Sequence, residues 1–308
     1  MEQQNWERQT LEKLALAAVQ EQRRARHWGV FFKTLTFIYL FALLFIGMEW
    51  IGPGAGVAVS HTALIDIQGE IGAEGEVTAD NTISSLQTAF EDSHTKGIIL
   101  RINSPGGSPV QAGIINDEIL RQRKLHPKIP VYAVVEDICA SGGYYIAVAA
   151  DKIFVDKASI VGSIGVIMDG FGFTGTMEKL GVERRVMTAG DNKAFLDPFS
   201  PLNPEQKAFA QNMLDEIHQQ FITVVRQGRG ARLKEMPDMF SGLFWSGETS
   251  IKLGLADGLG SSESVAREVI MEDNIVDFTV REGLADRFAK RFGAAMASSL
   301  SGPATRIH

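Results

Sequence analysis

The sequence is short of the residues on which several protein classes depend. Its 308 residues include a single cysteine, Cys139, so the chain cannot close an internal disulfide. It contains no metal-ligand spacing such as His-Glu-x-x-His, and we expect neither a metal nor a cofactor. The formal net charge is −7 and no basic cluster is interleaved with aromatic residues, which argues against a nucleic-acid partner. The rest is an ordinary globular composition with enough apolar residues for a substantial core.

One long uncharged stretch stands near the N-terminus. Residues 34–48 carry no charge, and the apolar run extends past Glu49 to Pro53, which is long enough to span a bilayer. Basic residues precede this run, and no lysine or arginine follows it before Ala63. These basic residues are Arg23, Arg24, Arg26 and Lys33. By the positive-inside rule, residues 1–33 lie in the cytoplasm and the rest of the chain lies outside it.

We predict that residues 34–52 form an uncleaved transmembrane anchor, preceded by a short amphipathic helix over residues 1–26. A cleaved signal peptide is the alternative, with a small-residue site at 56–58. The segment before the apolar run is much longer than the charged region of a signal peptide, which favours the anchor. A buried core helix is disfavoured because the stretch is apolar on every face.

Strand and helix patterns alternate after the anchor. Runs rich in Ile and Val predict strands at 63–67, 97–102, 131–135, 152–155 and 184–188. Helical patterns cover 82–90, 110–125, 142–150, 175–180 and 204–227. This alternation predicts parallel βαβ units. We expect the folded domain to cover residues 57–270, followed by an amphipathic or flexible tail over 271–308.

A serine between small residues marks the candidate site. Ser141 lies in Cys139-Ala-Ser-Gly-Gly143, between a predicted strand and a predicted helix. Small neighbours let a substrate approach closely, and free amides at a helix N-terminus favour a developing negative charge. Ser141 is therefore a candidate nucleophile. Cys139 lies within the apolar run, so we interpret it as a small buried residue rather than a reactive thiol.

A serine nucleophile needs a base. No histidine lies between Ser141 and His218, although folding can bring a distant histidine close. His218 stands beside the apolar stripe of the predicted 204–227 helix, and we interpret it as an ordinary, partly exposed histidine. Lys193 is the other candidate, because an amine acts as a general base where desolvation favours its neutral form. Taken alone it is weak, since most lysines in such loops are solvated.

Two more glycine-containing segments complete the pattern. Ser104-Pro-Gly-Gly107 ends a predicted strand with backbone amides that are able to donate to an oxyanion, although this motif alone is typical of any tight turn. Val161-Gly-Ser-Ile-Gly-Val166 carries a second glycine-flanked serine, Ser163.

These four segments, in this order and spacing, resemble the S49 peptidases, the signal peptide peptidase A family, in its short membrane-anchored bacterial form. The resemblance covers roughly residues 60–265. It implies an α/β fold of the ClpP/crotonase-like spiral type, with repeated ββα units. It further implies a Ser/Lys dyad of Ser141 and Lys193, with Ser163 orienting the lysine amine. The implied oxyanion donors are the N–H groups of Gly107 and Gly142, with Gly106 as an alternative to Gly107.

The resemblance also implies a function. It indicates a serine endopeptidase that degrades remnant signal peptides and similar apolar peptides, held in the bacterial inner membrane with its catalytic domain in the periplasm. It implies a homo-oligomeric ring in which the serine of one subunit meets the lysine of the next. The expected walls of an apolar substrate pocket are Val161, Ile164, Ile167 and Met168. Two alternatives stay open: a non-catalytic membrane scaffold of the same fold, and a crotonase-like acyl-CoA enzyme, which predicts a cytoplasmic location.

Overall fold

A computed structural model describes residues 2–47 and 59–281, and the chain divides into two units that are treated separately. In the first unit the described residues form one helix, α1 (Glu2–Gly47). Its segment Gln20–Leu44 is long and apolar enough to cross a membrane. The predicted amphipathic helix and the start of the predicted anchor are therefore continuous. The last residues of the predicted anchor, after Gly47, lie outside the described residues.

The second unit is built on a mixed sheet with the strand order β6-β5-β3-β2-β1-β8. Its central strands are β1 (His61–Ile71), β2 (Thr95–Gly107) and β3 (Val131–Ala140), and they run parallel. At one edge, β8 (Ile275–Asp277) pairs with β1, also in parallel. Long apolar runs in the central strands are buried on both faces, as expected of a parallel sheet covered on both sides.

Strand β3 pairs with different strands along its length. Its first half pairs with β4 (Lys152–Val155), and its last residues, 138–140, pair with β5 (Ile160–Gly162). Beyond these, β7 (Gly258–Leu259) adds to β4, and β6 (Phe244–Ser246) adds to β5 as an antiparallel strand. The sheet therefore forks along β3 between Val134 and Ile138, a few residues before Ser141.

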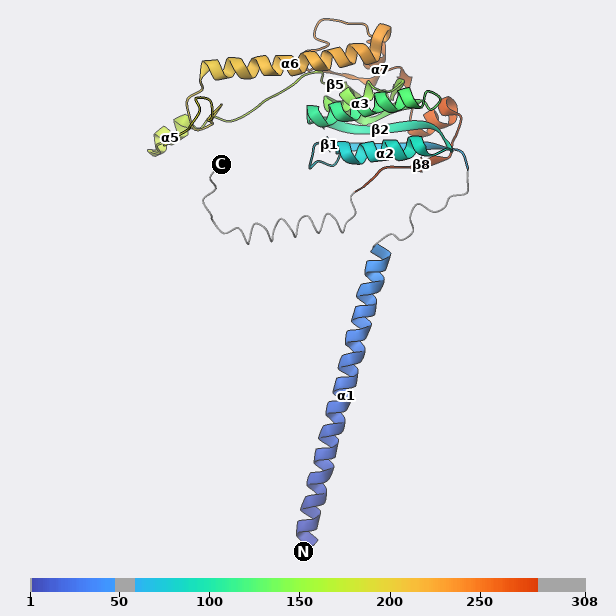
Figure 1. Ribbon diagram of the computed structural model, residues 1–308, viewed down its shortest axis with the longest axis vertical. Coiled ribbons are helices and arrows are strands. Elements are labelled where there is room, and N and C mark those ends of the chain that lie inside the picture. The colour runs from blue at the N-terminus through green and yellow to red at the C-terminus, as the bar shows by residue number, and fades with distance from the viewer. Residues whose placement is uncertain (1, 48–58, 282–308) are drawn as a thin grey trace. The chain divides into compact units, whose positions relative to one another are not determined.

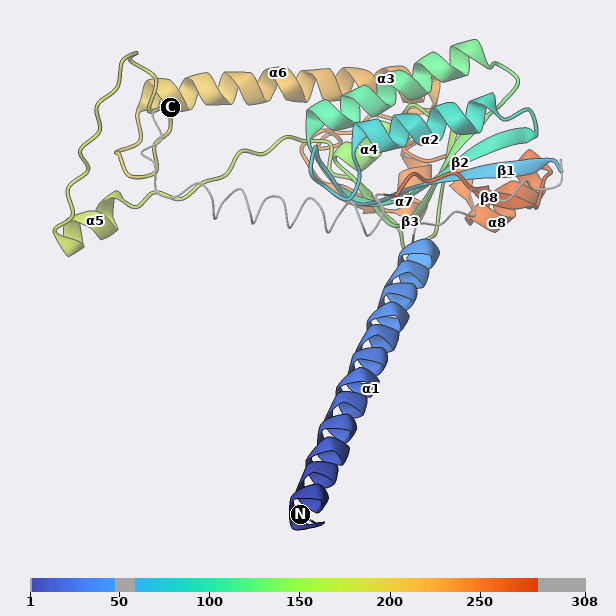
Figure 2. The same ribbon diagram turned by 60° about the horizontal axis from the view of Figure 1, so that its bottom comes forward.

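Helices cover both faces of this sheet. On one face lie α2 (Ala79–Glu91), α3 (Pro109–Leu125) and the short α4 (Gly142–Ala147). Figures 1 and 2 show α2 and α3 side by side. The side chains of Thr78 and Ser108 cap the N-termini of α2 and α3 by accepting backbone N–H bonds.

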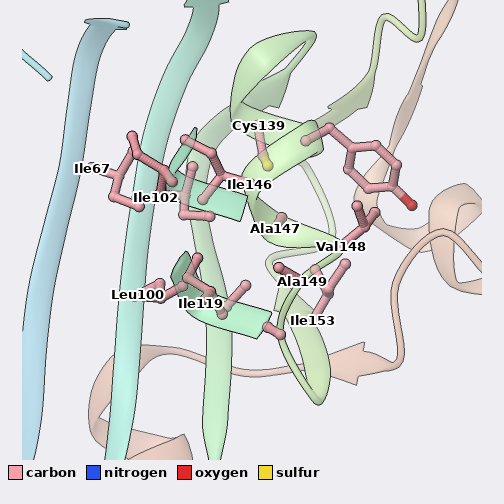
Figure 3. Close-up of a cluster of buried hydrophobic side chains, with 14 of the residues drawn as sticks. Ile67, Leu100, Ile102, Ile119, Cys139, Ile146, Ala147, Val148, Ala149 and Ile153 are labelled. Atoms are coloured by element: carbon pink, nitrogen blue, oxygen red, sulfur yellow. The ribbon is translucent and has the colours of Figure 1, made fainter. Parts of the chain in front are cut away.

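The main core lies between these helices and the strands. Figure 3 shows Ile102 of β2, Ile119 of α3 and Ile146 of α4 packed in one apolar cluster, with Cys139 of β3 beside them. A smaller cluster lies where Leu64, Ile99 and Val134 meet the segment after β7. This segment contains α8 (Ser262–Val265) and a helical turn, Ala266–Ile270.

Between β5 and the long helix α6 (Pro204–Arg229), the chain leaves the core as an arm, residues 166–203, which contains α5 (Thr174–Leu180). Figures 1 and 2 both place α5 and its neighbours near the N-terminal end of α6, away from the sheet. The C-terminal part of α6 packs on the core through Phe221 and Val225, whereas Phe209 near its start is 66 % exposed. After α6 come a 3-10 turn, Gly230–Arg232, and α7 (Gly247–Lys252).

Most of the predicted elements are confirmed, and one is wrong. The strands expected near 63–67, 97–102, 131–135 and 152–155 are β1 to β4, and the long helix predicted over 204–227 is α6. The helix predicted over 142–150 already ends at Ala147. Residues 184–188, predicted as a strand, form no strand, because this part of the arm has no neighbouring strand to pair with.

The C-terminal boundary also differs from the expectation. Strand β8 lies beyond residue 270, in the segment predicted as tail, yet it pairs with β1. Most of the tail predicted as amphipathic or flexible, residues 282–308, lies outside the described residues.

Candidate active site

The structure places Ser141 in a sharp turn between β3 and α4. β3 ends at Ala140 and α4 begins at Gly142, and Ser141 between them has φ 52° and ψ −121°. A positive φ is rare for a residue with a side chain and costs on the order of 1–3 kcal/mol, so it persists only where surrounding contacts impose it. Two backbone hydrogen bonds do this: the N–H of Ser141 donates to Gly162 O at 2.9 Å, and its carbonyl accepts from Tyr145 N at 2.9 Å. Such a strained turn is typical of an exposed catalytic serine.

The Ser104-Pro-Gly-Gly107 turn packs against Ser141. Ser104 is fully buried, and its hydroxyl donates to Gly69 O at 2.6 Å while it accepts from Gly106 N at 3.1 Å. Gly106 and Gly107 have φ values of +106° and +144°, which favour glycine. A Cβ on Gly142 would lie 3.3 Å from the backbone nitrogen of Gly107, so the two proposed oxyanion donors are neighbours.

The choice between Gly106 and Gly107 has a structural argument. The N–H of Gly106 already donates to Ser104 Oγ, whereas Gly107 lines a pocket together with Ser141 and Gly142. These contacts favour Gly107 over Gly106 as the donor.

This pocket has a volume of about 380 Å³ and brings several of the predicted site residues together. Ser141, Gly142, Gly107 and Ser163 all line it, and so does Ile167. Residues that the sequence analysis did not assign to the site complete the walls. They are Pro109, Tyr145, Gly165, Val166, Ile217, Gln220, Phe221, Ser241 and Gly242.

Three of the four residues predicted to form the pocket walls do not line the pocket at Ser141. Val161 and Ile164 are fully buried, because their side chains belong to the core under the site. Met168 is half-exposed on the arm and does not line the pocket, whereas Ile167, which does, is 84 % exposed. The walls instead come from α4 and α6, where Tyr145 and Phe221 pack ring against ring at 5.1 Å. The apolar stripe of α6 was the sequence signal for this wall, since Ile217 and Phe221 belong to it.

The backbone at Ser163 is strained in the same way as that at Ser141. Its φ is also 52°, and its N–H donates to Leu243 O at 2.8 Å. It follows Gly162, whose carbonyl holds the Ser141 N–H, so the two serines are linked through one short segment of backbone.

Lys193 does not line this pocket. It is exposed in the arm, and the pocket is built from other segments of the same chain. Gln206, at the start of α6, holds the loop around Lys193, here called the lysine loop. Its Oε1 accepts from Leu196 N at 3.0 Å, and its Nε2 donates to Asn192 Oδ1 at 3.4 Å. Within one chain the described structure thus keeps the proposed base loop apart from the serine pocket.

The remaining sequence candidates supply neither a nucleophile nor a metal site. Cys139 is fully buried, and burial raises the pKa of its thiol far above the usual range, so it is a packing residue and not a nucleophile. His218 is partly buried, and its Nε2 lies 3.1 Å from Ile164 O. The described residues contain no cluster of His, Cys, Asp and Glu able to hold a metal ion.

Comparison with known proteins assigns the family. A family model described as "Peptidase family S49" matches residues 123–275. A protein of Synechocystis sp. named "Putative protease slr0021" is 33 % identical over 201 residues, which make up 65 % of this chain and 70 % of that one. The chain belongs to peptidase family S49. The S49 match contains Ser141, Ser163 and Lys193, and it argues against the acyl-CoA enzyme alternative.

Two other S49-like matches concern longer proteins. "Putative signal peptide peptidase SppA" of Enterococcus faecium is 33 % identical over 202 residues, 66 % of this chain and 58 % of that one. "Na(+)/H(+) antiporter NhaA" of Brucella abortus (strain 2308) is 48 % identical over 188 residues, 61 % of this chain. The chain spans only 25 % of that Brucella protein. Most of the protein that bears the antiporter name therefore lies outside the match.

A solved protease structure shares the fold of this chain. A solved structure of a lysine-to-alanine mutant of the "1510-N membrane-bound stomatin-specific protease", in complex with a substrate peptide, superposes with a TM-score of 0.50. It covers 77 % of this chain and 100 % of the other at 16 % identity, a level that shows the fold alone. The predicted fold class is confirmed.

Proposed function

We propose that this S49 protein is a membrane-anchored serine endopeptidase, with Ser141 as the nucleophile and Lys193 as the general base. The observation that carries the proposal is the strained turn at Ser141, packed beside Gly107 and Gly142 in a pocket with apolar walls. Strain of this kind needs a reason, and exposing a nucleophilic hydroxyl next to backbone donors is one.

The proposed reaction needs only groups of the chain and water. Neutral Lys193 accepts the proton of the Ser141 hydroxyl as the oxygen attacks the peptide carbonyl, and the backbone N–H groups of Gly107 and Gly142 stabilise the oxyanion. The protonated amine then donates to the leaving nitrogen, which leaves an acyl-enzyme. Lys193 next activates a water molecule that hydrolyses the ester. Ser163 accepts or donates a hydrogen bond at the lysine amine and so orients it.

We propose that the lysine acts on the serine of a neighbouring subunit, in a homo-oligomeric ring. Lys193 lies outside the pocket of its own chain, which supports this arrangement. The arm and the start of α6 also expose many apolar side chains, as an interface between subunits requires. They include Phe171, Leu180, Val182, Met187, Leu202 and Phe209.

The proposed substrates are signal peptides and other apolar peptides. The walls supplied by Tyr145, Ile217 and Phe221 fit apolar side chains, and one relative is named as a signal peptide peptidase. Released signal peptides stay near the bilayer, where the apolar segment of α1 would hold the enzyme. We place the protein in the bacterial inner membrane, with residues 1–33 cytoplasmic and the catalytic domain periplasmic.

Complementation between two inactive variants tests the dyad and the ring together. The full-length protein in detergent micelles is given a fluorogenic synthetic signal peptide, and the wild type is compared with Ser141→Ala, with Lys193→Ala, and with the two variants expressed together. We expect each single variant to lose at least about a hundredfold in kcat, as for removal of a catalytic group. We expect the co-expressed pair to recover a measurable fraction of wild-type activity.

The other outcomes are informative. Near-normal activity in Lys193→Ala would exclude Lys193 as the base. Inactive single variants without recovery in the mixture would keep the dyad but place both residues in one subunit. A fully assembled wild type that cleaves no peptide would favour the non-catalytic scaffold.

A further inference from the structure

His218 contacts the backbone next to Ser163. It lies on α6, and its Nε2 is 3.1 Å from the carbonyl oxygen of Ile164, the residue after Ser163. A carbonyl oxygen only accepts, so this ring nitrogen carries the hydrogen. The bond joins α6 to the strained segment that contains Ser163.

This strained segment is also held by backbone hydrogen bonds and by the core. Ser163 N donates to Leu243 O at 2.8 Å, and Gly165 N donates to Ser163 O at 3.0 Å. The Ile164 side chain is anchored in the core. Among the hydrogen bonds of the described residues, the one from His218 is the sole bond between α6 and residues 162–167.

The two elements joined by this bond line the same pocket. Ile217 and Phe221 of α6 line the pocket, and Ser163 and Gly165 line it from the strained segment. A shift of α6 relative to Ser163 would change the pocket walls and the position of the Ser163 hydroxyl together. Errors of about 1 Å in such groups are costly for catalysis.

We propose that His218 is a positioning residue that holds Ser163 in the geometry needed to orient the Lys193 amine. This inference rests on the proposed function, because it needs Lys193 to be the base. His218 does not touch the reacting atoms, and it acts through the backbone at Ile164.

A double-mutant cycle tests this role. In the full-length protein, His218→Leu removes the donor at similar volume, whereas His218→Gln keeps an N–H donor at a similar reach. Both are made in the wild type, and His218→Leu is also made in Ser163→Ala. Gln211→Leu is the matched control, because Gln211 is an exposed residue on the same helix and, among the described residues, its side chain hydrogen-bonds Asp215 alone. An activated ester substrate keeps slow variants measurable.

We expect His218→Leu to lower kcat by roughly tenfold with KM changed less than about twofold, because it removes an interaction needed in the transition state. His218→Gln should keep at least about a third of the wild-type kcat, and Gln211→Leu should match the wild type. In the Ser163→Ala background, His218→Leu should cause little further loss, since residues that act through one another are not additive.

Three results would overturn the inference: an unchanged kcat in His218→Leu, an equal loss in both backgrounds, or a Ser163→Ala variant with normal kcat. If His218→Leu does not assemble, His218→Asn replaces it, because its shorter amide does not reach Ile164 O. Failure of the proposed function is separate, since it appears as activity retained in Lys193→Ala.

Discussion

Gly106 lies so close to Ser141 that a Cβ atom on Gly106 would stand 2.7 Å from the Cβ of Ser141. The same atom would be 2.7 Å from the backbone nitrogen of Gly142, and Gly106 has φ +106°. The turn at the end of β2 and the turn that carries Ser141, the proposed nucleophile, are therefore packed as one unit, with no room for a side chain between them.

Replacing Gly106 with alanine should consequently disable the site. We expect Gly106→Ala to lower kcat by at least about a hundredfold, the range seen when one oxyanion donor is lost, because Ser141 and Gly142 must move. Gly113→Ala is the matched control, since Gly113 lies in α3 and the added Cβ would meet no atom within 4 Å beyond its chain neighbours and the nearby backbone of its own helix, so its activity should be unchanged. Peptide hydrolysis by both full-length variants gives the comparison. Equal activity in the two would mean that the turn adapts to the added methyl group.

Gln206 should control the mobility of the lysine loop. It bonds Leu196 N and Asn192 Oδ1, on either side of Lys193, and Leu196 has a positive φ of 50° that needs such support. We expect Gln206→Ala to lower kcat by roughly tenfold, because the base is less well placed. Gln211→Ala, on the same helix, should have no effect. Steady-state kinetics of the two variants decides this, and a change confined to KM would contradict it.

Asp257 should make stability depend on pH at the acid end. The Arg229 side chain is 1 % exposed, and its guanidinium donates to both carboxylate oxygens of Asp257 at 2.8 and 2.9 Å. Burial alone would raise the pKa of Asp257, but the bonds from Arg229 and from Ile153 N outweigh it and hold the pKa below the ordinary value of 3.8. The stabilisation is thus complete above pH 3.8 and is lost as the pH falls through the lower folded-state value.

The Asp257→Asn variant tests this linkage. At pH 7 it should be less stable than the wild type by about 3 kcal/mol, because Arg229 stays buried without a countercharge. The difference should shrink as the pH falls, since a protonated Asp257 resembles asparagine. Thermal unfolding between pH 7 and pH 2 measures it, because the loss begins near pH 3.8 and is complete only below the folded-state pKa. A difference that does not depend on pH would show that the charge of Asp257 is unimportant.

Cys139 should be inert to thiol reagents in the folded protein. Its side chain is fully buried and its thiol pKa is raised by burial, so neither access nor thiolate is available. With a chromogenic disulfide reagent at pH 8 we expect no reaction in the folded protein and one thiol per chain after denaturation. Rapid labelling accompanied by loss of activity would instead place Cys139 in an open site.

The turn at Ser141 was predictable because its signals are local. An apolar strand, a serine between small residues and a following helix appear in order along the sequence, and the structure has β3, Ser141 and α4 in that order. The pocket walls were not predictable in this way. Val161 and Ile164 are apolar residues close to Ser163, but their side chains enter the core, and the walls come from α4 and α6.

Partners distant in sequence also escaped prediction. The bond from His218 to Ile164 joins residues 54 positions apart, and no local sequence pattern indicates it. The strand predicted over 184–188 failed for a related reason. Strand propensity depends on cross-strand neighbours, and Val186 and Met187 in the arm are exposed without any.

Helix α1 is much longer than a bilayer requires. At about 1.5 Å per residue its 46 residues extend about 69 Å, more than twice the hydrocarbon thickness of about 30 Å. Even when tilted, a single-pass helix of this length keeps several turns in water. In the proposed membrane-anchored enzyme those turns belong to the cytoplasmic N-terminal segment, so α1 continues from that segment into the membrane as one unbroken helix.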